Sequence, residues 1–215
     1  MLFVWCKVSF DEKRSHGSAV CETVYFFVEF VCVFPWKCVS LNNQNRGKIM
    51  DGILRKLPIG IQTFEKLREG DYLYVDKTAL VWRIASTETP YFLSRPRRFG
   101  KSLLLSTFEA YFEGKKELFE GLAIADMEKE WKTYPVFHLD LNAEKYDSPQ
   151  ALVEILSRQL TQWELKYGKG EDEETLSGRF AGVIRRASEQ ADRGVVVLVD
   201  EYDKPLLQAL DDGAL

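Results

Sequence analysis

The sequence predicts an α/β fold in which helices cover a mostly parallel β-sheet, and two segments carry this prediction. The first, residues 91–105, reads as a short apolar strand, a basic loop ending in Gly-Lys-Ser, and an apolar-periodic helix. The second, residues 195–201, is an apolar, mostly β-branched run followed by Asp-Glu. Such a run is typical of a central parallel strand buried on both faces. Acidic residues at its carboxyl end lie where open α/β sheets place their ligands.

The basic loop has the setting of a phosphate-binding loop. In such loops, backbone N–H groups and the positive end of the following helix face an anion, and the lysine reaches the outer phosphates. The pattern is imperfect, because Arg95 stands where the general motif has its first glycine. The acidic pair supplies the second half of a nucleotide site. An aspartate there can hold Mg²⁺ on a nucleotide, and a glutamate can orient and deprotonate water. A basic loop and a core strand that ends in acids are the structural alternatives, but together and in this order the two motifs predict nucleotide binding.

Bulk properties exclude several other classes. The 215 residues suffice for one or two domains with a sizeable core. The net charge of −4 gives no indication of general nucleic-acid binding. The most apolar run, residues 24–34, is interrupted by Glu29 and is shorter than the roughly 20 residues of a membrane span. We therefore expect a cytoplasmic protein with no membrane association and no evident nucleic-acid partner.

Residues 1–49 differ in composition from the rest of the chain. All 4 cysteines fall within them, at spacings that match neither a CxxC pair nor a zinc finger. One interpretation is a short strand-forming extension. The other is a segment that is not translated in the cell, because the codons for residues 45–49 can include a ribosome-binding sequence just before Met50. We expect one domain over residues 50–215, preceded by an N-terminal extension whose translation is in doubt.

The segment from Met50 to the basic loop predicts short elements. We expect a loop over residues 56–61 and a short helix from about Thr63, since Pro58 and Gly60 punctuate the chain there. Asp76 can cap a helix over residues 77–85, and lining an adenine pocket is its functional alternative.

The helix after the basic loop should follow the strand at residues 91–93 and end at Gly114. One apolar face of that helix is predicted to pack into the core; it carries Leu104, Phe108, Tyr111 and Phe112.

Residues 134–140 predict a further strand. His138 within it is interpreted as a packed or edge residue rather than a catalyst. Asp140 at its end either approaches the site or caps the following loop.

Two helices should come next. The first begins at Ser148-Pro149 and buries Leu152, Ile155, Leu156 and Leu160. The second follows the acidic run 171–174, interpreted as a solvated helix start, and carries Phe180, Val183, Ile184 and Ala187. Beyond the last strand, Asp203 with Pro205 is typical of a helix N-cap.

Four ordered motifs, LPIGIQTF, YVDKT, RPRRFGKS and VLVDEYDKP, resemble those of the predicted AAA-ATPase-like family of bacterial proteins. The resemblance covers about Leu57 to Leu210, and Arg95 in the loop looks usual for that family. It implies a P-loop NTPase three-layer sandwich with Walker A and Walker B motifs, and ATP and Mg²⁺ as ligands. Lys101 would contact the β- and γ-phosphates and serve catalysis, and Ser102 would contact Mg²⁺.

The remaining roles follow from the same resemblance. Asp200 would hold Mg²⁺ through water, and Glu201 would activate the hydrolytic water. Phe99 and Gly100 would supply loop backbone. Arg97 and Arg98 would add charge near the phosphates, although pairing with local acids explains these two arginines equally well.

The resemblance also carries an expectation about the sheet. In ATPases of this broad class, a later strand lies between the phosphate-loop strand and the strand with the acidic pair, so we expect a domain that is truncated at its C-terminus. An unfilled gap would leave backbone groups unpaired, and residues 50–215 alone should be poorly stable. The expected function is ATP binding with Mg-dependent hydrolysis, in a homo-oligomer or with a protein partner. The alternatives are a non-hydrolysing nucleotide-binding interaction module and a nonfunctional gene fragment.

Overall fold

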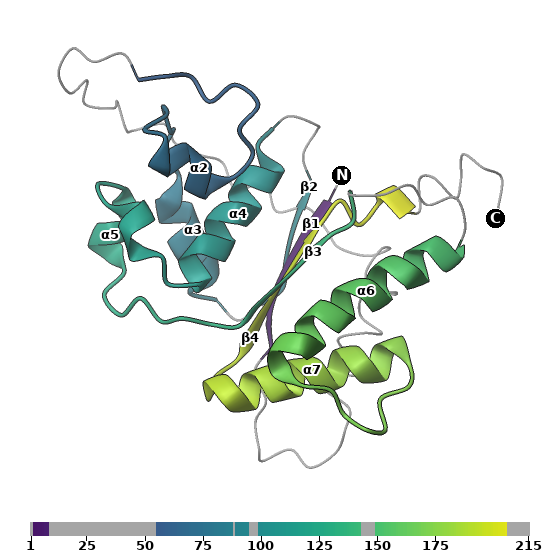
Figure 1. The fold of residues 1–215 in the computed structure, drawn as a ribbon. Coiled ribbons are helices and arrows are strands. Elements are labelled where there is room, and N and C mark those ends of the chain that lie inside the picture. The colour runs from purple at the N-terminus through teal and green to yellow at the C-terminus, as the bar shows by residue number, and fades with distance from the viewer. Residues whose placement is uncertain (1, 9–54, 88, 95–98, 143–148, 206–215) are drawn as a thin grey trace.

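A four-stranded sheet with helices on both sides forms the centre of the molecule (Figure 1). The structure, a computed structural model, describes residues 2–8, 55–87, 89–94, 99–142 and 149–205. The strands are β1 (Leu2–Val8), β2 (Tyr91–Ser94), β3 (Val136–Asp140) and β4 (Val195–Asp200), and their order across the sheet is β2-β1-β4-β3. The predicted α/β class is confirmed.

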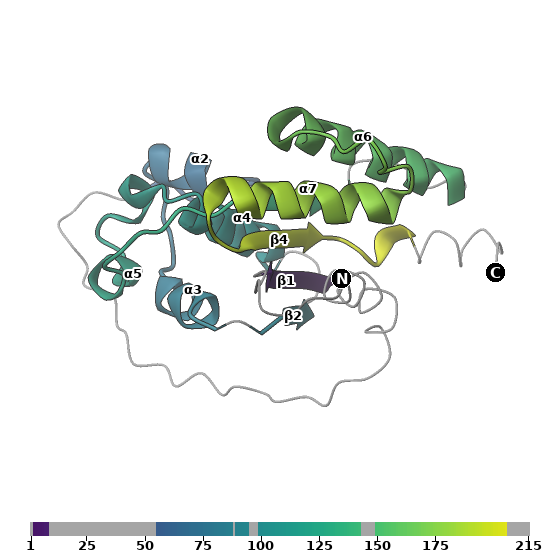
Figure 2. The ribbon, with the colours of Figure 1, turned by 90° about the horizontal axis from the view of Figure 1, so that it is seen from below.

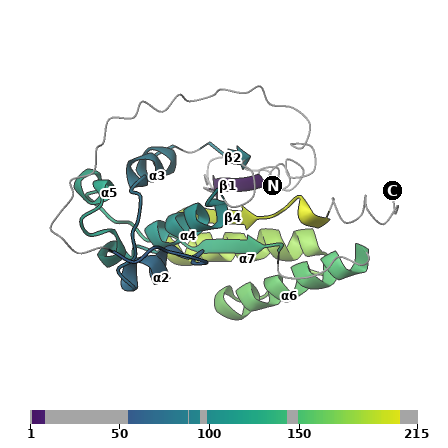
Figure 3. The same cartoon turned by 90° about the horizontal axis from the view of Figure 1, so that it is seen from above.

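The strand directions correct the predicted sheet. β3 pairs with β4 in parallel, as expected, whereas β1 pairs antiparallel with both of its neighbours. The described sheet is therefore mixed rather than mostly parallel. The reason is that the position between β2 and β4 is filled by a strand from residues 1–49, the segment that we had set apart from the domain. Figures 2 and 3 show β1 in this central position.

Short helices cover one side of the sheet (Figure 1). They are α2 (Phe64–Glu69), α3 (Thr78–Ala85), α4 (Lys101–Phe112), the 3₁₀ helix η1 (Lys116–Phe119) and α5 (Ala123–Met127). The first three were predicted from the sequence, whereas η1 and α5 were missed because neither is long enough to show a helical period. Aromatic packing holds η1 in place, since the rings of Phe119 and Phe64 lie 4.8 Å apart.

Two longer helices, α6 (Pro149–Tyr167) and α7 (Leu176–Ala191), lie on the other side. Both were predicted, and Val183, Ile184 and Ala187 of α7 are buried. The interpretation of the acidic run as solvated holds for Glu171, Asp172 and Glu174, which are exposed, and needs a correction for Glu173. α7 is capped by the hydroxyl of Thr175, and the Glu173 side chain is only 12% exposed because Arg186 binds it.

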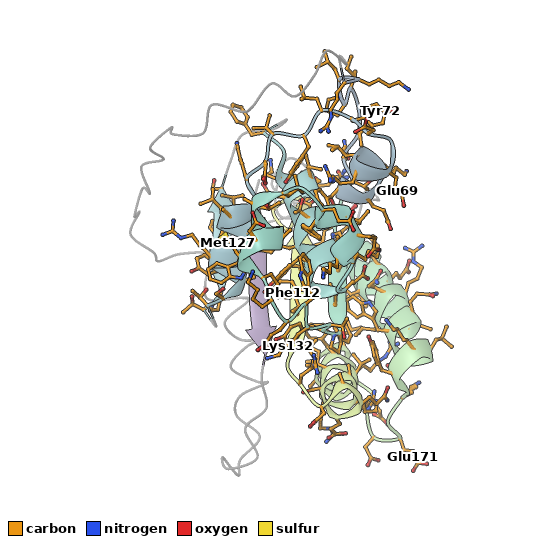
Figure 4. All side chains as sticks on the ribbon, turned by 90° about the vertical axis from the view of Figure 1, so that its left-hand side faces the viewer. Glu69, Tyr72, Phe112, Met127, Lys132 and Glu171 are labelled. Atoms are coloured by element: carbon orange, nitrogen blue, oxygen red, sulfur yellow. The ribbon has the colours of Figure 1, made fainter. Side chains whose placement is uncertain are left out.

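The apolar residues of β4 alternate between the two helical layers. Val196 and Leu198 pack with α4, whereas Val195 packs with α6 and α7. This double burial confirms the prediction of a central strand. Figure 4 shows the same division of the chain, with Phe112 among the helices and the exposed Glu69 and Glu171 at the periphery.

The predicted face of α4 is confirmed in part. Phe108 and Phe112 are fully buried, but Leu104 and Tyr111 are only partly so, and Leu105 takes the central place. Gly114, with a φ of +74°, follows the end of the helix as predicted. Among the helices of the described residues, we find none that combines the length and the apolar character required to cross a membrane.

Candidate functional site

The N-terminus of α4 follows a glycine in a left-handed conformation. Gly100 precedes it with a φ of +73°, a left-handed conformation that glycine adopts without steric cost. The N–H of Leu104 donates to the Gly100 carbonyl at 3.0 Å, so the N–H groups of the first three helical residues have no partner within the helix. Among the described residues, no side chain caps this end. These groups and the helix dipole suit an anion.

Two side chains of the predicted site belong to this helix end. Lys101, the first residue of α4, is only 6% exposed, and Ser102 is partly buried. Phe99 is largely exposed just before the helix. Arg97 and Arg98, like Arg95, lie outside the described residues. A buried cation therefore stands at the beginning of α4.

The carboxyl end of β4 carries the two predicted acids. Asp200 is 5% exposed and Glu201 is 8% exposed. Oδ1 of Asp200 is buried and, within the described part of the chain, has no hydrogen-bond partner. Leaving a buried acceptor unsatisfied costs about 1–3 kcal/mol, more for a charged group. Such an oxygen is suited to a metal ion or a water that binds with the ligand.

Glu201 has an unusual backbone and an altered acidity. Its φ is +57°, a value that residues other than glycine rarely adopt. Residues with such backbone angles cluster at functional sites. Burial raises the pKa of its carboxyl group, and the charge of Asp200 raises it further, while Lys101 opposes both effects. A carboxylate with a raised pKa is a better general base than an exposed one.

The two motifs meet on one side of the sheet. Val196 and Leu198 face α4, and side chains two residues apart in a strand share a face. Asp200 therefore lies on the α4 side. The influence of Lys101 on the Glu201 pKa places the end of β4 near the beginning of α4. The structure brings Lys101 near Glu201 and the neighbouring Asp200, about a hundred positions later in the sequence, and their role as a nucleotide site stays a prediction.

His138 joins α4 to the sheet. Its Nδ1 lies 3.0 Å from Oε2 of Glu109, so the pair links β3 to α4. Burial favours the neutral imidazole, but the Glu109 carboxylate outweighs it and raises the pKa of His138, assisted by Asp140 and Asp200. The interpretation of His138 as a packed residue fits this contact. Sequence reasoning missed Glu109, because nothing in a helical sequence marks a partner in a distant strand.

Two other predicted acids have structural partners. Oδ1 of Asp76 accepts from the Thr78 N–H at 2.8 Å at the beginning of α3, and Oδ2 accepts from the Ala123 N–H at 2.8 Å. Asp76 therefore binds the first N–H of α3, but the N-cap position itself belongs to Lys77, whose side chain makes no capping bond, so the capping prediction is confirmed only in part. Asp140 accepts from the Asn142 N–H at 2.8 Å, which is its loop-capping alternative, although it is also the strand partner of Asp200.

The last predicted cap is confirmed only at its beginning. Residues 204 and 205 are helical directly after Asp203, and the chain from 206 onward lies outside the described residues.

Comparisons with known proteins assign the chain to a family. The family described as predicted AAA-ATPase matches residues 58–215, which include β2, α4 and β4. The uncharacterized protein in the vnfD 5′ region of Azotobacter chroococcum mcd 1 is 44% identical over 157 residues. That alignment covers 73% of this chain and 30% of the relative, so the chain spans about a third of the relative's length. No solved structure matches the chain.

Proposed function

Because the chain belongs to the predicted AAA-ATPase family, we propose that it binds ATP with Mg²⁺ and hydrolyses it at the site formed by α4 and the end of β4. The observation that carries the proposal is the meeting of Lys101, at a helix N-terminus, with the buried pair Asp200 and Glu201. A basic helix start suits the phosphates, and an acidic strand end suits a metal ion and a water.

Each residue has a distinct role in the proposed reaction. Lys101 and the first N–H groups of α4 hold the β- and γ-phosphates and offset their charge. Glu201, whose raised pKa makes it the stronger base, orients the attacking water and accepts its proton. Burial of both residues keeps bulk water away from the reacting groups, which strengthens each electrostatic contact.

The residues present fit Mg²⁺. Oxygen is the ligand this ion prefers, and it commonly binds through one or two protein groups, with phosphates and waters completing an octahedron. The unpartnered Oδ1 of Asp200 and the hydroxyl of Ser102 would hold it. When bound, the ion neutralises charge on the phosphates.

Two substitutions test the proposal. Glu201→Gln should retain ATP binding and lower turnover by at least about 100-fold, the range for removing a general base. Lys101→Ala should weaken ATP binding itself. Binding is measured by calorimetry and turnover by phosphate release.

Charge-matched controls at exposed positions are Glu189→Gln and Lys132→Ala, which should change neither quantity. If Glu201→Gln and Lys101→Ala both behave like these controls, the site assignment is wrong. Tight ATP binding without turnover in the unmodified chain would instead identify a nucleotide-binding interaction module.

A further inference from the structure

The backbone of Glu201 is held on both sides by hydrogen bonds. The N–H of Leu141 donates to the Asp200 carbonyl at 3.1 Å, which fixes the peptide group before Glu201. The N–H of Lys204 donates to the Glu201 carbonyl at 3.0 Å, which fixes the peptide group after it. Because φ and ψ describe the rotation of these two peptide groups about one Cα atom, the two bonds together restrain the backbone of Glu201.

A restraint is needed at Glu201, because its φ is +57°. A left-handed backbone costs free energy in a residue with a Cβ atom, and aspartate adopts it more often than most residue types. Asp71 and Asp192, with φ of +49° and +50°, belong to that tolerant type, whereas Glu201 does not. Without contacts from the rest of the fold, Glu201 would therefore favour a negative φ, and its carboxyl group would point in another direction.

The side chain of Lys204 supplies a long-range contact. Its Nζ donates to the Asn142 carbonyl at 2.5 Å and to Oδ1 of Asn142 at 3.3 Å, across 62 positions of sequence. Asn142 is itself held by Asp140, whose Oδ1 accepts from the Asn142 N–H at 2.8 Å. Lys204 therefore closes the turn after β4 with its backbone, and its side chain ties that turn to the segment after β3.

The same two segments also pack together through apolar side chains. Leu141 is buried in a cluster with Val199, and the partly buried Tyr202 packs against this cluster. Apolar contacts hold the two segments close together, but they are non-directional and leave the rotation of the Glu201 backbone open. The directed bonds of Lys204 determine that rotation.

We propose that Lys204 is a positioning residue, which by binding Asn142 holds Glu201 in its left-handed conformation with the carboxyl group facing the beginning of α4. Lys204 acts through Glu201 and not on the nucleotide, because its Nζ binds Asn142. The positioning role rests on the proposed function, in which Glu201 is the general base. The conformational role does not, because it concerns only the backbone of the ligand-free chain.

Two substitutions at position 201 test the conformation in the full chain without ATP. Glu201→Gly and Glu201→Ala remove the same charge and differ by one methyl group, but only glycine adopts a positive φ without steric cost. In thermal melts, Glu201→Gly should unfold about 2–4 °C above Glu201→Ala. With Lys204→Met added to both, this advantage should disappear, because glycine costs more entropy than alanine where the backbone is ordinary. Lys204→Gln, whose side chain is shorter, should act in the same way, so the test does not depend on the folding of one variant.

Turnover of ATP tests the positioning role. Lys204→Met should lower kcat by about 10–100-fold, the scale for a misplaced reacting group, and leave the KM for ATP within about twofold. Lys204→Arg keeps a cation that can donate to the Asn142 carbonyl and should restore most of the lost turnover. Asn142→Ala removes only the more distant acceptor, so its effect should be smaller than that of Lys204→Met. Lys132→Met, at an exposed ion pair, is the matched control and should change neither kcat nor KM.

A Glu201→Gly advantage that persists in full with Lys204→Met would overturn the proposal, since Lys204 would then have no influence on the backbone of Glu201. A Lys204→Met variant whose turnover is not restored by Lys204→Arg, or whose KM rises as much as its kcat falls, would overturn the positioning role. Absence of turnover in the unmodified chain would instead contradict the proposed hydrolysis. The melting order of the position-201 variants would then still decide whether Lys204 holds the backbone of Glu201.

Discussion

The helix pair α6–α7 and the carboxyl end of β4 both bury charged groups, but these groups differ in how completely they are paired. Between the helices, Arg179 holds Glu164 through two bonds of 2.7 and 2.8 Å, and it also donates to the Ser157 hydroxyl at 2.7 Å. Arg186 holds Glu173 in the same two-pronged manner. At the end of β4, by contrast, a buried oxygen of Asp200 has no partner among the described residues, and the pKa of Glu201 is raised by burial.

Under the proposed function, this difference in pairing separates structural charges from functional ones. A two-pronged arginine–carboxylate pair satisfies both groups and lowers the pKa of the carboxyl, as Arg179 does for Glu164 and Arg186 for Glu173. Such a pair fixes two helices and leaves little capacity for a ligand. The acids of β4 keep that capacity, at a cost in stability that the rest of the fold must offset. We therefore expect burial with incomplete pairing, rather than burial alone, to mark a site.

The largest expected effect comes from breaking the paired region. Arg179→Ala leaves Glu164, whose side chain is 6% exposed, without its main partner. We expect a loss of about 3 kcal/mol in unfolding free energy, at the low end for a broken buried pair because Glu164 borders a hollow lined also by Leu165 and Lys169. Arg185→Ala removes an exposed pair and should cost less than about 0.5 kcal/mol. Urea melts at pH 7 measure both.

The pH dependence of this loss has a defined sign. Because Arg179 lowers the pKa of Glu164, the pair stabilises the fold above the unfolded carboxyl pKa, about 4.3, and its contribution disappears as pH falls through the lower folded value. The difference between the unmodified chain and Arg179→Ala should therefore shrink in acid. A difference that stays constant down to pH 2 would show that Arg179 acts through packing and not through charge.

At the carboxyl end of β4, the contribution of Glu201 to stability should change with pH in the opposite direction to that of Glu164. The raised pKa of Glu201 means that the folded state holds its proton more tightly than the unfolded state does. Ionised Glu201 therefore lowers stability as pH rises above the ordinary carboxyl range. Glu201→Gln should stabilise the fold at pH 7 by about 1 kcal/mol, the low end of the cost of a buried unpaired polar group.

That gain should vanish near pH 4, where the native carboxyl is already protonated, and Glu189→Gln should show no gain at either pH. Thermal melts of the ligand-free chain give both values. Destabilisation by Glu201→Gln at pH 7 would mean that Glu201 has a structural partner and belongs with the paired charges.

How much of the structure the sequence predicts depends on how far apart in the chain the interacting residues lie. The elements with a clear period or a capping residue, such as α7 and the helix beginning beside Asp76, were found, whereas the roles of Lys101, Asp200 and Glu201 stay a prediction. Their motifs depend on residues that are neighbours in the chain. The Glu109–His138 contact and the Arg179–Glu164 pair were not found, because each joins side chains on different elements and neither partner has a local signature.

The central strand was the largest miss, and its reason is also physical. Nothing in residues 2–8 distinguishes a strand between β2 and β4 from one at an edge, since the register and the direction are set by the partners. The composition of residues 1–49 separated them from the domain, whereas backbone pairing placed seven of them at its centre.

The smallest expected effect concerns His138 and Glu109, a pair that is neither fully paired nor left without a partner. His138 binds Glu109 through Nδ1, while its Nε2 is buried with no partner among the described residues. Although burial favours the neutral ring, the carboxylates of Glu109, Asp140 and Asp200 raise the pKa of His138. The charged pair therefore stabilises the fold fully below the unfolded histidine pKa, about 6.5, and this contribution is lost as pH rises through the higher folded value.

Glu109→Gln should remove that step. Its cost should be below about 1 kcal/mol, because both side chains are about a third exposed, at 28% and 33%. Unfolding free energies measured from pH 6 to pH 9 should fall for the unmodified chain and stay nearly level for the variant, with Glu113→Gln on the next turn as the control. A variant that keeps the full pH step would assign it to Asp140 and Asp200. His138 would then report on the acids of the site, and the link between α4 and β3 would rest on packing.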